Sequence, residues 1–166
     1  MRKITKQIGL THCGLASIAN CTNYTEHELH NKIDFKELPK GLTIDELYSF
    51  LQDIKKSDNS IGSIEKITLQ NPEHLKSIIL ESEKCDNKHV IANFYMKTVY
   101  PDEGDYGHFS PIVSANDDEC CIGDVWPPVP DYTWLTYEKL YAAVNTIDSD
   151  SGRPRGLIVF EYTTNN

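Results

Sequence analysis

The hydrophobic period of this sequence changes half-way along the chain, and that change narrows the available folds more than any other feature. Residues 44–54 repeat apolar side chains at intervals of three and four, which is the period of an α-helix. From residue 88 onward the apolar runs are short, β-branched and aromatic, as in 88–100, 108–116 and 156–162. The order predicts helices first and a mostly antiparallel sheet afterwards, an α+β fold packed in layers.

Local signals mark where the helices begin. Segments 25–28 and 43–46 both start with Thr and end with Glu, the pattern of a capping box. Residues 71–72 place Asn before Pro, which favours a cap followed by the first helical position. The small, apolar stretch 13–22 predicts a buried helix, and 137–147 predicts a short one near the end of the sheet.

Length and charge limit the classes of function. The chain has 166 residues, enough for one domain over 1–166 with a substantial core, and its net charge of −9 argues against nucleic acid as a partner. The sequence contains no apolar run of about 20 residues, so no membrane span is expected. The basic start is followed by no apolar stretch of the signal-peptide kind. We therefore expect a cytoplasmic protein, with a secreted effector as the alternative.

The cysteines do not form a recognisable framework. There are five, and none belongs to a CxxC pair or to a zinc-finger spacing. An odd number without a pattern favours a reducing compartment. Cys120 and Cys121 are adjacent in a predicted strand, where neighbouring side chains face opposite sides of the sheet. We expect one core thiol and one surface thiol, with a soft-metal or redox contact as the alternative.

Cys13 is the candidate nucleophile. It stands at the start of the predicted helix 13–22, and both a helix N-terminus and a nearby histidine favour the reactive thiolate. Of the six histidines, His108 best suits this role, because it follows a glycine and opens an apolar strand after a loop. The plain alternatives are a core cysteine at the head of a helix and a histidine in a turn.

A hairpin brings a third group to the histidine. If strands 109–116 and 119–125 pair through a short turn, Asp124 lies beside His108 at the same sheet edge. A carboxylate there would orient the imidazole. Gln7 precedes the predicted helix and could donate a hydrogen bond to an oxyanion, together with the main-chain N–H of Cys13.

These residues occur in strings that resemble the catalytic domain of the phytochelatin synthases, a family within the papain-like cysteine peptidase clan. The strings are "CGLAS" at 13–17, "GHFSPI" at 107–112, "DV" at 124–125 and "NTIDSDSGRPRG" at 145–156. The resemblance covers residues 7–160 and is strongest from "GHFSPI" onward. It implies a papain-like fold in which helices pack on an antiparallel sheet.

The resemblance also implies roles for four residues. Cys13 corresponds to the nucleophile, His108 and Asp124 to the other members of the triad, and Gln7 to the oxyanion-hole glutamine. The implied activity is cleavage of the Cys–Gly bond of glutathione through a γ-glutamylcysteinyl enzyme. Hydrolysis then gives γ-Glu-Cys, and transpeptidation gives phytochelatin. The compact form resembles the prokaryotic members and favours hydrolysis.

The substrate's γ-glutamyl carboxylate requires a local cation on so acidic a protein. The resemblance assigns Arg155 to this task, with Arg153 as the neighbouring alternative, and a guanidinium grips a carboxylate in two places. No cofactor is expected for the chemistry and no metal ligands are assigned. Cd²⁺ or Zn²⁺, or their glutathione thiolates, are candidate activators. A homodimer is a candidate assembly.

Two other functions fit the same residues. The first is a papain-like acyltransferase, deamidase or peptidase that acts on a protein, which a triad supports equally well. The second is a non-catalytic module that binds metals or thiols, since the chain has five cysteines and six histidines. The papain signature C-G-S/A-C-W/Y is missing around Cys13, so action on long peptide chains does not follow from the sequence.

Overall fold

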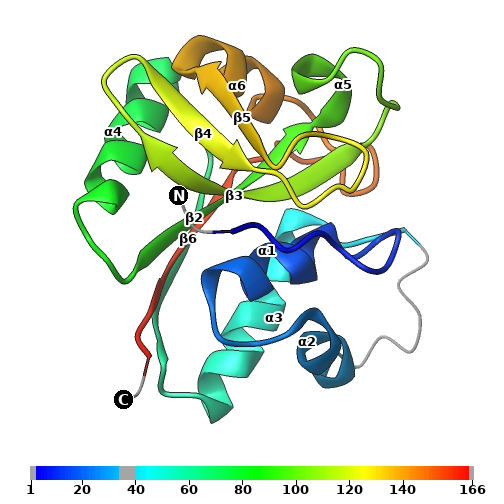
Figure 1. Ribbon diagram of the computed structural model, residues 1–166, viewed down its shortest axis with the longest axis vertical. Coiled ribbons are helices and arrows are strands. Elements are labelled where there is room, and N and C mark those ends of the chain that lie inside the picture. Colours follow the sequence, from blue (N-terminus) through cyan, green and yellow to red (C-terminus); the bar gives the residue numbers. More distant parts are fainter. Residues whose placement is uncertain (1–2, 34–39, 165–166) are drawn as a thin grey trace.

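The computed structural model describes residues 3–33 and 40–164, which contain six helices and six strands (Figure 1). The helices are α1 (Cys13–Cys21), α2 (Glu26–Lys32), α3 (Ile44–Ser57), α4 (Pro72–Glu83), α5 (Met96–Val99) and α6 (Tyr137–Val144). The strands are β1 (Ile61–Ile67), β2 (Lys88–Tyr95), β3 (Gly107–Ala115), β4 (Glu119–Gly123), β5 (Tyr132–Thr136) and β6 (Leu157–Tyr162). No helix of the described ranges has the length and apolar character needed to cross a membrane.

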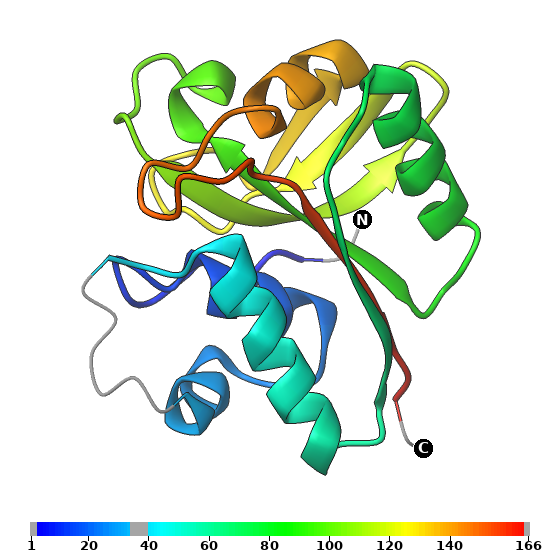
Figure 2. The same ribbon diagram turned by 180° about the vertical axis from the view of Figure 1, so that it is seen from behind.

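The six strands form one sheet in the order β1-β6-β2-β3-β4-β5, and every neighbouring pair is antiparallel. Helices α1, α2 and α3 pack on one face, and α4, α5 and α6 pack on the other (Figures 1 and 2). The α+β fold is therefore as predicted, with the first three helices on one face and the last three on the other.

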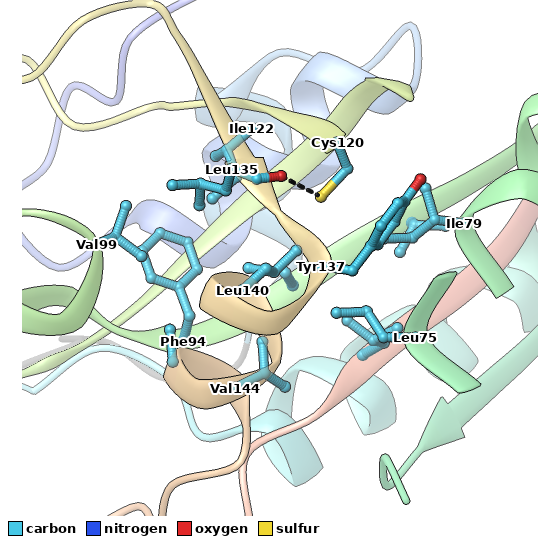
Figure 3. Packing of buried hydrophobic residues seen from close by; sticks show 14 of the residues in the cluster. Leu75, Ile79, Phe94, Val99, Cys120, Ile122, Leu135, Tyr137, Leu140 and Val144 are labelled. Carbon is cyan, nitrogen blue, oxygen red and sulfur yellow. Dashed lines mark hydrogen bonds between the residues drawn. The ribbon is translucent and has the colours of Figure 1, made fainter. Parts of the chain in front are cut away.

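Side chains alternate between two cores along the central strands. In β6, Leu157 and Val159 face the core under α4 and α6, whereas Ile158 and Phe160 face the core under α1 and α3. A strand buried on both sides reads as a continuous apolar run, which is why "LIVF" shows no alternation in the sequence. Figure 3 shows the first of these cores, where residues of α4 and α6 pack against the sheet.

The capping signals coincide with the helix starts. Thr25 and Thr43 each accept a hydrogen bond from the main chain three residues later, and the Glu at that position bonds back to the cap, which completes both capping boxes. The Asn71 side chain caps α4 by accepting from the main-chain N–H of His74, with Pro72 in the first turn.

The structure differs from the sequence-based expectation in three elements. The run 88–100 is not one strand, because the chain turns into the short helix α5 after Tyr95. Strands β1 and β5 were not expected. Strand β1 lies at a sheet edge and alternates only weakly in burial, and β5 is only five residues long at the opposite edge. Edge strands carry weaker sequence signals because at least one side faces water.

The expectation of one core and one surface thiol in the vicinal pair is wrong. Cys120 and Cys121 are both fully buried, although they do point to opposite faces as adjacent strand residues must. Cys120 joins the core under α6, where its thiol lies 3.8 Å from the carbonyl of Leu135 (Figure 3). Cys121 is buried because the face of β4 opposite α6 is also covered. Ile4, from the N-terminal segment, packs against that face at Gly123.

Candidate active site

Cys13 is the first residue of α1, so its thiol lies where the main-chain N–H groups of the helix have no partner within the helix. Helix α1 is buried from Gly14 to Ile18 and packs against β3, which fixes the position of its N-terminus. The side chain of the preceding residue, His12, does not cap the helix. The positive end of the helix dipole is thus directed at the half-buried thiol.

The β3–β4 hairpin brings His108 and Asp124 together. Ala115 pairs with Cys120 near the turn, and the strands run back so that His108 on β3 lies beside Asp124, just after β4. The His108 Nε2–H donates to Asp124 Oδ1 over 2.8 Å, and both side chains are buried. The ring of Phe94 contacts the imidazole edge-to-face at 5.4 Å. These contacts leave the other ring nitrogen for the thiol.

The shifted pKa values of Cys13, His108 and Asp124 describe the charge state of the candidate triad. Burial raises the pKa of Cys13, but a hydrogen bond to His108 and the charge of the imidazolium outweigh it, so the pKa lies below its ordinary value. Burial lowers the pKa of His108, yet its hydrogen bonds to Asp124 and Cys13 raise it to about 9. Burial of Asp124 is likewise outweighed by His108, and its pKa is lowered. The arrangement favours a thiolate–imidazolium pair.

Asp124 has two further partners that the sequence did not indicate. The main-chain N–H of Trp126 donates to Oδ1 over 2.9 Å, and the Tyr100 hydroxyl lies 2.8 Å from Oδ2. Tyr100 follows α5, inside the segment that was expected to be a strand. No spacing or motif marks it, because its position depends on how α5 folds back toward the β4–β5 connection.

Gln7 reaches the cleft beside Cys13, and its main-chain N–H is held by the carbonyl of Val125 over 2.8 Å. Its side-chain amide nitrogen donates to the carbonyls of Gly9 and Leu10 over 2.7 and 3.1 Å. Both amide hydrogens are therefore in use. To bind an oxyanion, Gln7 would have to exchange one of these carbonyls for the substrate.

The N-terminal segment is anchored at two points. Lys6 Nζ donates to the carbonyls of Asp124 and Val129 over 3.0 and 2.9 Å and to that of Trp126 over 3.2 Å. On the other side, the buried Glu26 carboxylate accepts from the N–H groups of Ile8 and Gly9 and lies 2.7 Å from His12 Nδ1. These contacts hold the loop that carries Gln7 against both α2 and the Asp124 turn.

A cleft of about 440 Å³ opens over Cys13 and His108. A second hollow of about 330 Å³ adjoins it and contains Arg155. The two share the same lining along Lys40, Leu42, Tyr106 and Gly107. A ligand that occupies both would pass along this shared edge.

The Arg155 side chain is buried and held in place. It donates from Nη1 to Asn93 Oδ1 over 3.2 Å and from Nε to Thr146 Oγ1 over 3.1 Å, and it lies 3.5 Å from Asp148. Gly107 makes room for the guanidinium, since a Cβ there would lie 1.9 Å from Nη1. Burial lowers the pKa of Arg155, and Asp148 opposes the shift.

Of the two candidate arginines, only Arg155 lines this hollow. Arg153 is exposed and pairs with Asp45 at 3.0 Å, in a separate surface depression. For metals, residues 3–33 and 40–164 contain no group of three or more His, Cys, Asp or Glu side chains placed to hold an ion.

Comparison with protein families matches residues 1–157 to "Phytochelatin synthase". The chain belongs to the phytochelatin synthase family. Among solved structures, it is similar to a C39-like peptidase from Bacillus anthracis, with a TM-score of 0.62 and 12% identity over 99% of this chain and 96% of that one. A search of curated proteins found no match.

Membership of the phytochelatin synthases and the peptidase-like architecture together indicate a cysteine enzyme of the peptidase or transferase type with a papain-like fold. At 12% identity the C39-like peptidase informs the fold alone. The expected family and fold are thereby confirmed.

Proposed function

We propose that this protein cleaves the Cys–Gly peptide bond of glutathione by a thiol mechanism, with Cys13 as nucleophile and His108 and Asp124 completing a triad. The observation that supports this most is the junction of two hollows, one over Cys13 and His108 and the other over a buried arginine. Cleavage of glutathione requires a reactive thiolate at the scissile bond and a cation that binds the γ-glutamyl carboxylate. The two adjoining hollows contain one of these groups each.

In the first step, the Cys13 thiolate attacks the carbonyl carbon of the Cys–Gly bond. The negative charge moves to the carbonyl oxygen. The main-chain N–H of Cys13 would stabilise it, together with the Gln7 amide once that amide exchanges the carbonyl of Gly9 or Leu10 for the oxyanion. As the C–N bond breaks, the His108 imidazolium gives its proton to the leaving amine, and glycine departs. A γ-glutamylcysteinyl thioester remains on Cys13.

In the second step, neutral His108 takes a proton from water as the water attacks the thioester. The C–S bond breaks, γ-Glu-Cys leaves, and the thiolate–imidazolium pair is restored. A second glutathione in place of water would give phytochelatin from the same intermediate. Of the two outcomes, we propose hydrolysis.

The Arg155 hollow suits the γ-glutamyl end of the substrate, which carries both an α-carboxylate and an α-ammonium group. Arg155 supplies the cation, and Asp148 and Asp150 line the same hollow with carboxylates. A zwitterion can satisfy both signs at once. This matching of charges explains how a protein of net charge −9 would hold an anionic peptide.

Incubation with glutathione, with and without Cd²⁺ or Zn²⁺, followed by mass analysis of the products, tests the proposal. γ-Glu-Cys with free glycine identifies the hydrolase, and a product lengthened by one γ-Glu-Cys unit identifies the transpeptidase. If glutathione stays intact under all three conditions while a denatured protein substrate is cut in parallel, the protein-directed peptidase replaces this proposal.

A further inference from the structure

The cleft over Cys13 continues on the side away from Arg155, and that part is formed by different residues. Gln7, Leu10, Thr11 and Trp126 line the Cys13 cleft but not the Arg155 hollow. None of the four carries a charge. Leu10 is 84% exposed, although it is a large apolar side chain beside the nucleophile. Because Leu10 and Trp126 line the cleft, an apolar group bound there would remove their surface from water.

The direction of the substrate follows from the two hollows. With the γ-glutamyl group at Arg155, the scissile carbonyl lies at Cys13. The residue that follows the scissile bond must then extend past Cys13 toward Leu10 and Trp126, because the γ-glutamyl group already occupies the Arg155 hollow. This part of the cleft is thus the site of the leaving residue.

Resting on the proposed function, we propose that this part of the cleft selects an apolar leaving residue. The preferred substrates are then γ-glutamylcysteinyl peptides in which a large apolar residue, rather than glycine, follows the cysteine. The chemistry of the two steps is unchanged, and only the departing amine differs.

One physical reason supports this preference over glycine. Glycine has no side chain, so it would leave Leu10 and Trp126 in water, whereas a leucine side chain would cover them. The terminal carboxylate is common to both leaving residues, so it does not contribute to the preference.

The test compares γ-Glu-Cys-Gly with γ-Glu-Cys-Leu by release of the free amino acid. For the parent protein, we expect kcat/KM to be about tenfold higher with the leucine peptide, the usual scale for filling an apolar subsite. Leu10→Arg should remove this preference, because it deletes the apolar contact and places a cation beside the leaving carboxylate.

Ile8→Arg is the matched control. Ile8 lies on the same loop and is 83% exposed, but its side chain is outside the Cys13 cleft, so the same charge there should leave the leucine preference intact. Because both side chains project into water, neither variant should disturb folding, which circular dichroism checks.

The outcomes separate the two proposals. Equal or higher kcat/KM with the glycine peptide in the parent protein overturns the apolar-site inference and leaves glutathione cleavage standing. An equal loss of preference in Leu10→Arg and Ile8→Arg also overturns it, since charge on the loop rather than the cleft contact would be responsible. If neither peptide is cleaved, the proposed function itself fails.

Discussion

Replacement of Gly107 by alanine should weaken glutathione binding without harming the nucleophile. The added Cβ would lie 1.9 Å from Arg155 Nη1 and 2.7 Å from Cζ. Ordinary contact needs about 3.4 Å or more between such atoms, so the guanidinium would have to move by about 1.5 Å. It is buried and bonded to Asn93 and Thr146 over 3.2 and 3.1 Å, and a shift of that size breaks both contacts.

The cost can be estimated from the contacts that the substrate would lose. A hydrogen bond to a charged group is worth about 1.5–3 kcal/mol, and a displaced guanidinium forfeits at least one with the substrate carboxylate. Since about 1.4 kcal/mol is a factor of ten, KM for glutathione should rise roughly 10- to 100-fold. The value of kcat should change much less, because His108 and Asp124 keep their own contacts.

The assay is steady-state release of glycine, with the rate of iodoacetamide alkylation of Cys13 as the internal control. Alkylation depends on the thiolate and His108 but not on Arg155, so it should match the parent rate. An unchanged KM in Gly107→Ala would refute the placement of the substrate carboxylate at Arg155. Slower alkylation would show that the substitution acts on the nucleophile instead.

Three further predictions concern the charged groups. Activity should require both the Cys13 thiolate and the His108 imidazolium. The value of kcat/KM should therefore rise as the pH passes the lowered pKa of Cys13 and fall as it passes the pKa of His108, about 9. A pH profile that stays flat to pH 10 would contradict the thiolate–imidazolium pair. Tyr100→Phe removes a hydrogen bond that lowers the pKa of Asp124, so this carboxylate should protonate at a higher pH and then cease to accept from His108. We therefore expect kcat to fall about tenfold and activity on the acid side to be lost at a higher pH than in the parent protein. A purely structural role would lower the melting temperature but leave the profile in place. Lys6→Met should leave three carbonyls without their donor and lower the melting temperature by roughly 3–8 °C in calorimetry. An unchanged melting temperature would mean that these three hydrogen bonds contribute nothing to stability.

The elements that the sequence predicted well are those with local signals. Thr25, Thr43 and Asn71 stand where the helices start because a cap is decided within four residues. The juxtaposition of His108 and Asp124 was also accessible, since one short turn fixes the register of a hairpin and hence which residues share an edge. The catalytic roles of these residues stay predictions until they are assayed.

The features that the sequence did not reveal depend on distant parts of the chain. Tyr100 contacts Asp124 only because α5 interrupts the run that began as β2, and nothing near residue 100 encodes that contact. Cys121 is buried because its strand is covered on both faces, which no local pattern reports. The choice of Arg155 over Arg153 likewise follows from the fold, which turns one arginine inward beside Gly107 and leaves the other at the surface.

The most direct test of the central claim is the rate of glycine release from glutathione by Cys13→Ala, with Cys85→Ala as the matched control. Cys85 is an exposed cysteine outside the cleft, so its loss should leave the rate at the parent value. Cys13→Ala should fold normally and release no glycine above the uncatalysed background. Release by Cys13→Ala at the parent rate would contradict the assignment of Cys13 as the nucleophile.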